Sequence, residues 1–201
     1  WAIANLRGGG EEGEEWHRAG MLANKQNVFD DFHAAAEYLI DKGWTTSNHL
    51  GIYGGSNGGL LVGAAMTQRP ELFNAVVCVA PLLDMIRYVE SELGPTWTVE
   101  YGDPADAEQF GWLHAYSPYH RVAQGTDYPA TMFAIFDNDT RTDPMHGRKM
   151  AAAVQAATIG SRPILVRTEG NVGHGARSLN KSIEESADTL TFMSHWTGLD
   201  D

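Results

Sequence analysis

Apolar residues in this chain fall into short runs that alternate with longer stretches of helical character. The short runs predict buried strands at residues 1–6, 50–53, 75–80, 130–136 and 164–168. The intervening stretches predict helices at residues 28–42, 58–68, 145–158 and 183–196. Strands that alternate with helices indicate an α/β fold, with a mainly parallel sheet covered by helices on both faces. The valine-rich run at 75–80 is typical of a strand that is buried on both sides.

One long segment, residues 81–128, has no clean periodicity. It is rich in aromatic side chains, and long irregular segments of this kind often form binding insertions. The chain contains no obvious internal repeat or low-complexity stretch. We therefore expect one domain over residues 1–201.

Composition narrows the possible partners. The chain carries 14 Lys and Arg against 26 Asp and Glu, a net charge of −12, which disfavours nucleic-acid binding. No stretch approaches the roughly 20 apolar residues of a membrane span. Because Cys78 is the single cysteine of this sequence, the chain cannot form an internal disulfide. The apolar neighbours of Cys78 predict an inert core residue.

The chain begins at Trp1 inside a predicted strand and without an initiator methionine. We expect it to be a piece of something longer, incomplete at its N-terminus, in which any upstream targeting segment would not be seen. A cytoplasmic location is the expectation, and a periplasmic or secreted protein stays open for the same reason.

The segment Gly54-Gly55-Ser56-Asn57-Gly58 carries the strongest chemical signal. It fits the G-x-S-x-G signature of a serine nucleophile, and it lies between a predicted strand and a predicted helix, as that signature requires. The glycines are needed because a side chain at those positions would clash with the adjoining strand or helix. The helix that begins after Ser56 would direct its amides toward developing oxyanion charge.

A nucleophilic serine needs a base and an orienting carboxylate. Reactive groups in parallel sheets gather at the carboxyl ends of strands. The strand at 164–168 leads into a loop with His174 between two glycines, and the strand at 130–136 leads into Asp137 and Asp139. The order serine, aspartate, histidine is that of α/β-hydrolases. The residues alone do not choose between the two aspartates, since Asp137 could simply cap the turn.

The other histidines fit the role of base less well. Two lie in predicted helices, where we expect surface or half-buried positions, and five lie in loops or at element ends. In that order they are His33 and His195, then His17, His49, His114, His120 and His146.

The glycine spacing of a dinucleotide-binding motif is present, but the residues around it do not suit a dinucleotide. Gly8-x-Gly10-x-x-Gly13 follows a predicted strand, but Glu11 and Glu12 would repel a pyrophosphate and no helix is predicted to begin at Gly13.

Metal sites are not predicted either. A calcium loop that began at Asp137 would need glycine where Thr142 stands and glutamate where Arg148 stands. No zinc motif or Cys/His cluster is present in the sequence. We expect no cofactor and no metal.

Several short sequence motifs, which follow one another in a fixed order, resemble those in the catalytic domain of the prolyl oligopeptidase family of serine peptidases. The resemblance covers nearly the whole chain. The asparagine after the nucleophile is more similar to prolyl oligopeptidase proper than to relatives that cleave after basic residues. The matching segments are residues 5–11, 22–27, 29–32, 54–61, 68–70, 97–102, 116–118 and 173–175.

The resemblance implies an α/β-hydrolase fold and hydrolysis of short peptides on the carboxyl side of proline, through an acyl-enzyme. It also chooses Asp139 over Asp137. A flat apolar pocket suits proline, which has a rigid ring and no N–H. The implied roles are nucleophile for Ser56, orienting carboxylate for Asp139, base for His174, oxyanion donor for the Asn57 N–H, substrate-carbonyl ligand for Arg141, and proline pocket for Trp97, Tyr101 and Leu82.

This sequence also departs from the family pattern. Thr140 stands at a position that is usually acidic and Thr142 at one that is usually apolar, which bears on the edge of the proline pocket. The family carries a β-propeller that admits only short peptides, and nothing here could form one.

The family's hydrolase domain also has strands before the position of Trp1 and a tyrosine that is the second oxyanion donor. We therefore expect this chain alone to be weakly stable and nearly inactive. Two alternatives stay open: a related hydrolase that acts as a basic-residue oligopeptidase or acylaminoacyl peptidase, and an inert fragment that serves as an interaction module.

Overall fold

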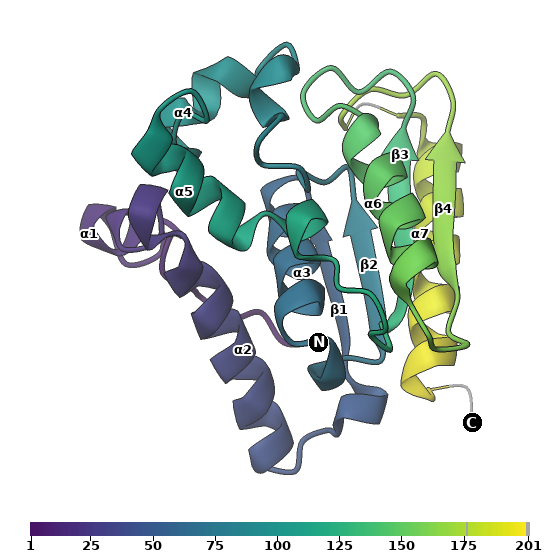
Figure 1. Cartoon of the computed structure of the whole chain (residues 1–201). Coiled ribbons are helices and arrows are strands. Elements are labelled where there is room, and N and C mark those ends of the chain that lie inside the picture. The colour runs from purple at the N-terminus through teal and green to yellow at the C-terminus, as the bar shows by residue number, and fades with distance from the viewer. Residues whose placement is uncertain (176, 200–201) are drawn as a thin grey trace.

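The computed structural model describes residues 1–175 and 177–199. Four parallel strands form one sheet in the order β1-β2-β3-β4 (Figure 1). This confirms the predicted α/β class and four of the five predicted strands. The strands are β1 (Gly51–Gly55), β2 (Ala75–Val79), β3 (Ala130–Phe136) and β4 (Ile164–Glu169).

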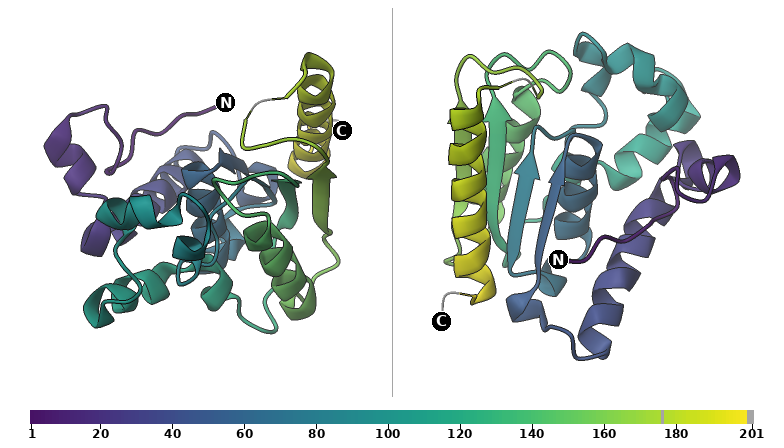
Figure 2. Two further views of the ribbon diagram at one scale, coloured as in Figure 1. Left: turned by 90° about the horizontal axis from the view of Figure 1, so that it is seen from above. Right: turned by 180° about the vertical axis from the view of Figure 1, so that it is seen from behind.

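Helices cover both faces of this sheet. Helices α2, α3 and α6 lie on one face, and α7 is the one helix of the described residues that covers the other (Figures 1 and 2). The α-helices are α1 (Glu14–Arg18), α2 (Gln26–Asp41), α3 (Asn57–Gln68), α4 (Thr98–Tyr101), α5 (Ala107–Tyr116), α6 (Met145–Ala157) and α7 (Leu179–Thr197). None of the helices in the described part of the chain is both long and apolar enough to cross a membrane.

The core divides according to the alternation of side chains along the strands. Val76 and Cys78 of β2 pack on the α3 and α6 side, whereas Val77 and Val79 pack under α7. Every residue of β2 is buried, as its valine content predicts. Burial also raises the pKa of the Cys78 thiol, so this cysteine is a packing residue and not a nucleophile.

The predicted first strand was wrong. Residues 1–6 have no strand hydrogen bonding, and the side chains of Trp1 and Ile3 are both 94% exposed. A strand requires a hydrogen-bonded neighbour. Within the described residues β1 pairs only with β2, and residues 1–6 form no ladder with its other side. The apolar pattern of residues 1–6 is present, but nothing here pairs with it.

The irregular segment contains more helix than the sequence predicted, since α4 and α5 both lie within residues 81–128. Helix α5 is capped by Asp106, whose carboxylate accepts hydrogen bonds from the amides of Glu108 and Gln109. Few of its side chains are buried, which is why no amphipathic period marked it. Asp106 followed by Gln109 three positions later was the signal that could have found it.

A third apolar cluster joins this segment to the rest of the domain. It contains Phe29 of α2, Leu82 of the loop after β2, Tyr101 of α4 and Tyr116 of α5. The aromatic segment is therefore anchored above the carboxyl ends of β1 and β2 (Figure 1).

Two smaller predictions also need correction. A short helix, α1, does begin directly after Gly13, so the case against a dinucleotide site rests on Glu11 and Glu12. His33 is buried, with 7% exposure, where the sequence predicted a surface or half-buried position.

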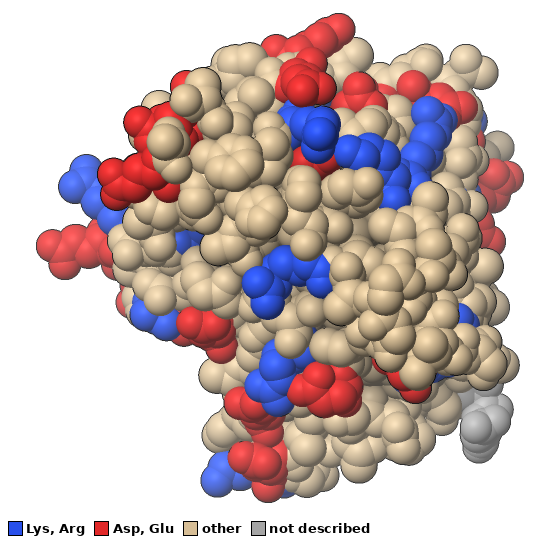
Figure 3. All heavy atoms as spheres, viewed as in Figure 1, with Lys and Arg blue, Asp and Glu red and all other residues tan. Residues whose placement is uncertain are grey.

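Charged side chains on the face seen in Figure 3 stand in separate groups, and many basic ones lie beside acidic ones. Among the ion pairs of the structure, Arg148 pairs with Asp137, and Arg69 pairs with Glu37 and Glu71.

Candidate active site

Ser56 lies in the sharp turn between β1 and α3, in a backbone conformation that is rare for a residue with a side chain. Its φ is 56° and its ψ is −117°, and its amide donates to the carbonyl of Val79 at 2.8 Å. Such strain persists only where the surrounding structure imposes it, and it is common at functional sites. The elbow thus holds the hydroxyl at the carboxyl end of the sheet.

The glycines around Ser56 are not equally constrained. A Cβ on Gly54 would collide with the backbone carbonyl of Gly58, and one on Gly59 would lie 2.7 Å from Cβ of Pro81. A Cβ on Gly58 would meet nothing within 4 Å. The prediction that Gly58 must lack a side chain for steric reasons was therefore wrong, and Gly59 has that requirement instead.

His174 joins the hydroxyl of Ser56 to the carboxylate of Asp139. Its Nε2 lies 3.0 Å from Ser56 Oγ, and its Nδ1 lies 2.7 Å from Asp139 Oδ2. With the Nδ1 proton donated to the carboxylate, Nε2 is free to accept the serine proton. The three residues come from the loops after β1, β3 and β4, because the carboxyl ends of parallel strands meet at one edge of the sheet.

Asp139 is held as an anion by four hydrogen-bond donors. Oδ1 accepts from the amides of Arg141 and Thr142, both at 3.0 Å, and Oδ2 accepts from His174 and from the Thr142 hydroxyl at 2.9 Å. Burial acts to raise the pKa of Asp139, but these hydrogen bonds outweigh it and the pKa is lowered. The carboxylate therefore stays ionised at neutral pH.

Asp137 has a different environment. Its side chain is 40% exposed and pairs with Arg148 at 2.8 Å. The structure thus brings Asp139, and not Asp137, to the imidazole.

Asn57 is the first residue of α3, where backbone amides have no partner within the helix. Its side-chain Oδ1 accepts a hydrogen bond from the hydroxyl of Tyr101 at 2.9 Å. Burial raises the pKa of Tyr101, so the hydroxyl stays protonated and can donate. Tyr101 is itself fixed by a T-shaped contact with the ring of Tyr88 and by the ammonium group of Lys25, which lies 5.1 Å from the centre of the Tyr101 ring.

The other residues predicted for the proline pocket lie in the same region. Leu82 is buried, and Trp97 is half-buried against the cluster that contains Leu82 and Tyr101. Arg141 is exposed, two residues beyond Asp139. Among the residues that the structure describes, no group of three or more His, Cys, Asp or Glu side chains is arranged to hold a metal ion.

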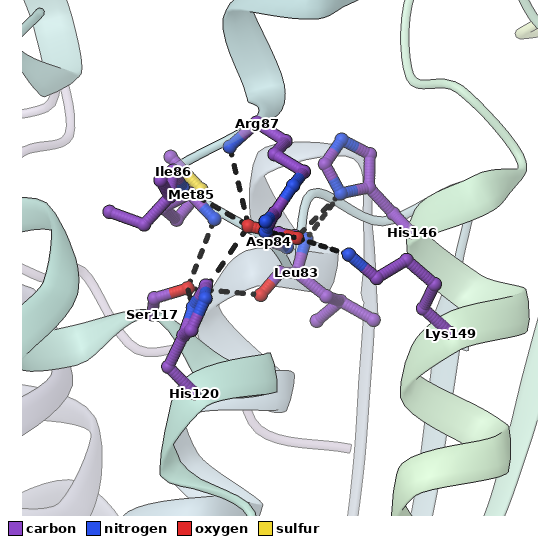
Figure 4. Close-up of polar contacts among 9 residues, drawn as sticks. All are labelled: Leu83, Asp84, Met85, Ile86, Arg87, Ser117, His120, His146 and Lys149. Carbon is purple, nitrogen blue, oxygen red and sulfur yellow. Dashed lines mark hydrogen bonds and ion pairs between the residues drawn. The ribbon is translucent and has the colours of Figure 1, made fainter. Parts of the chain in front are cut away.

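An ionic cluster around the buried carboxylate of Asp84 holds the loop that carries Leu82 (Figure 4). Asp84 has no exposed surface, and its carboxylate binds Lys149 Nζ at 2.5 Å, Arg87 at 3.0 Å and the amide of Ile86. Burial acts to raise the pKa of Asp84, but Lys149 and Arg87 outweigh it and the pKa is lowered. The loop after β2 is thereby tied to α6.

His146 completes this attachment. Its Nδ1 accepts from the amides of Asp84 at 3.1 Å and Leu83 at 3.4 Å (Figure 4). Burial lowers the pKa of His146 to about 4, which keeps the ring neutral and able to accept. Sequence reasoning missed this cluster, although the spacing of His146 and Lys149 on one helix face was visible.

The sequence also did not predict that Thr142 contacts Asp139 and His174. The sequence placed it at the edge of the pocket, but its hydroxyl lies between Asp139 and the Nδ1 of His174, with the latter at 3.1 Å.

Comparison with known proteins adds to this geometry. The sequence matches the prolyl oligopeptidase family over residues 1–200. The chain belongs to the prolyl oligopeptidase family. The resemblance drawn from the sequence is thereby confirmed.

Relatives in this family share both sequence and fold with the chain. A prolyl endopeptidase of Elizabethkingia miricola is 45% identical over 201 residues, which is 99% of this chain and 28% of that protein. A solved chain from a study of two prolyl endopeptidases has a TM-score of 0.95 and 56% identity, over 98% of this chain and 29% of that one. Prolyl oligopeptidase B from Galerina marginata, solved with a 35mer substrate, has a TM-score of 0.92 and 33% identity, over 96% of this chain and 28% of that one.

The chain thus spans about 28% of the length of the prolyl oligopeptidase family members that it matches. Its four-stranded sheet and covering helices correspond to part of their catalytic domain.

Proposed function

We propose that this chain carries the catalytic residues of a serine peptidase that hydrolyses short peptides on the carboxyl side of proline. One observation carries the proposal: the hydrogen-bonded series Asp139, His174 and Ser56, on a strained elbow, in a member of the prolyl oligopeptidase family. The names of the relatives, which are prolyl endopeptidases and prolyl oligopeptidases, support the choice of substrate.

The proposed reaction has two halves. Ser56 Oγ attacks the scissile carbonyl while Nε2 of His174 takes its proton, and the Asn57 amide donates to the oxyanion. His174 then gives the proton to the leaving amine, which departs from the acyl-enzyme. In the second half, His174 activates a water that hydrolyses the ester and restores Ser56. Asp139 holds the imidazole in the required tautomer throughout.

Selection for proline rests on the aromatic segment. Trp97 would stack on the pyrrolidine ring, Tyr101 and Leu82 would complete the pocket, and Arg141 would bind a substrate carbonyl. The absence of an N–H in proline favours such a pocket, because there is no donor whose burial would need a partner.

The substrate preference is tested with reporter amides that end in proline, arginine or alanine, using the native gene product that contains this chain. We expect the highest kcat/KM for the proline reporter, by about 100-fold or more, because the other side chains cannot reproduce the stacked ring. A Ser56→Ala variant serves as the matched control for contaminating peptidases. Faster cleavage after arginine would instead support a basic-residue oligopeptidase, and faster cleavage after alanine an acylaminoacyl-type hydrolase.

We also propose that the parent protein supplies a second oxyanion donor and a strand next to β1. The apolar side chains of Trp1 and Ile3, and that of Tyr53 in the edge strand β1, are exposed, which fits a surface that further chain covers. The isolated 201-residue chain should then react with a fluorophosphonate probe about 100-fold more slowly than the parent. Cleavage of a Gly-Pro reporter by the isolated chain at the parent's rate would contradict this. Complete absence of labelling in the parent would favour an inert interaction module.

A further inference from the structure

The hydroxyl of Thr142 lies within hydrogen-bonding distance of three groups. Thr142 Oγ1 is 2.9 Å from Asp139 Oδ2, 3.1 Å from His174 Nδ1 and 2.9 Å from the backbone carbonyl of Ala80. Thr142 is only 2% exposed, so water does not compete effectively for these contacts.

A threonine hydroxyl has one proton and two acceptor positions. When it donates to Asp139 Oδ2, that oxygen accepts from both Thr142 and His174, and the direction of the carboxylate is fixed on two sides. The Thr142 amide also donates to Oδ1 of the same carboxylate at 3.0 Å. One residue therefore contacts both oxygens of Asp139.

The third contact is an alternative one, because the single hydroxyl proton goes either to Asp139 Oδ2 or to the backbone carbonyl of Ala80 in the loop after β2, and the anionic carboxylate is the stronger acceptor. Ala80 has a positive φ of 42°, which is uncommon for a residue with a side chain, and its amide donates to Ala134 of β3. The Thr142 hydroxyl thus lies where the loops after β2, β3 and β4 meet.

We propose that Thr142 is a positioning residue, whose hydroxyl donates to Asp139 and aligns that carboxylate with Nδ1 of His174. The inference rests on the proposed peptidase function of Ser56, Asp139 and His174. Thr142 itself touches no reacting atom, and it acts through Asp139.

The test replaces Thr142 with valine, which has nearly the same shape but no hydroxyl, and with serine, which keeps the hydroxyl. In the native gene product, the pKa of the Asp139 carboxyl is followed by carbon NMR with labelled aspartate and assigned with an Asp139→Asn variant. The rate of Ser56 labelling by a fluorophosphonate is measured in the same samples.

We expect Thr142→Val to raise the pKa of Asp139 by about one unit, because a neutral donor to the anion is lost. Labelling should slow by about fivefold, and Thr142→Ser should restore both values toward those of the unmodified protein. A role limited to packing would leave the carboxyl titration of the valine variant unchanged, and that result would overturn the proposal.

The two proposals fail in different ways. If no variant and no unmodified protein reacts with the probe, the peptidase function fails, while the carboxyl titration still reports on Thr142. If the unmodified protein reacts and the valine variant titrates identically, only the role of Thr142 fails.

Discussion

Replacement of Asp139 with asparagine should lower kcat on a proline reporter by about 10⁴-fold. The asparagine amide can donate to Nδ1 of His174, so the imidazole would carry its proton on Nε2, where it cannot accept from Ser56. The change keeps the size of the side chain, and the loss therefore reports on the tautomer. Steady-state kinetics of the native gene product with a Gly-Pro reporter measure it.

Asp137→Asn is the matched control for this change. Asp137 lies two residues away in the same loop, but it is exposed and paired with Arg148. We expect its kcat to remain within about twofold of the unmodified value, because exposed ion pairs contribute little. Equal losses in the two variants would contradict the assignment of Asp139 as the orienting carboxylate.

Replacement of Gly54 with alanine should destabilise the fold by about 3 kcal/mol, because the new methyl group would collide with backbone and not with a movable side chain. The carbonyl of Gly58 lies in the first turn of α3, so relief of the clash requires that the helix shift away from β1. Denaturation by urea, followed by circular dichroism, measures the change in the free energy of unfolding.

Gly58→Ala provides the comparison within the same elbow. Its methyl group would meet nothing within 4 Å, and Gly58 lies inside a helix. The free energy of unfolding should therefore stay the same or rise by up to about 1 kcal/mol, since alanine restricts the unfolded chain. Similar losses in the free energy of unfolding for both substitutions would show that the predicted clash at Gly54 is not the cause of the destabilisation.

The parts of the fold that the sequence predicted are those where burial and local pattern agree. The run at 130–136 became β3 with the same bounds, and the helix predicted at 145–158 became α6 one residue shorter. Residues 1–6 have an equally apolar pattern. A segment becomes a strand only where a neighbouring strand is available to form hydrogen bonds with it, and the apolar pattern of the segment does not reveal whether such a neighbour exists. Helix α5 shows the reverse case, since a capping residue starts it and few buried side chains mark its length.

The sequence predicted which loops form the candidate active site, but not every side chain within them. The strand-end rule located the loops that contain Ser56, Asp139 and His174, because all parallel strands present their carboxyl ends to one edge. It did not choose between Asp137 and Asp139. That choice depends on how the loop turns after β3, where the amide of Asp139 bonds back to the carbonyl of Phe136. The role of Thr142 depends on the same turn.

The hydrogen bond from Tyr101 to Asn57 has a consequence for selectivity. In the proposed reaction Tyr101 is part of the pocket that binds the proline ring of the substrate, and the backbone amide of Asn57 donates to the oxyanion. A ligand that fits badly and displaces the phenol would also pull on the start of α3. Discrimination between substrates would then appear in the chemical step as well as in binding.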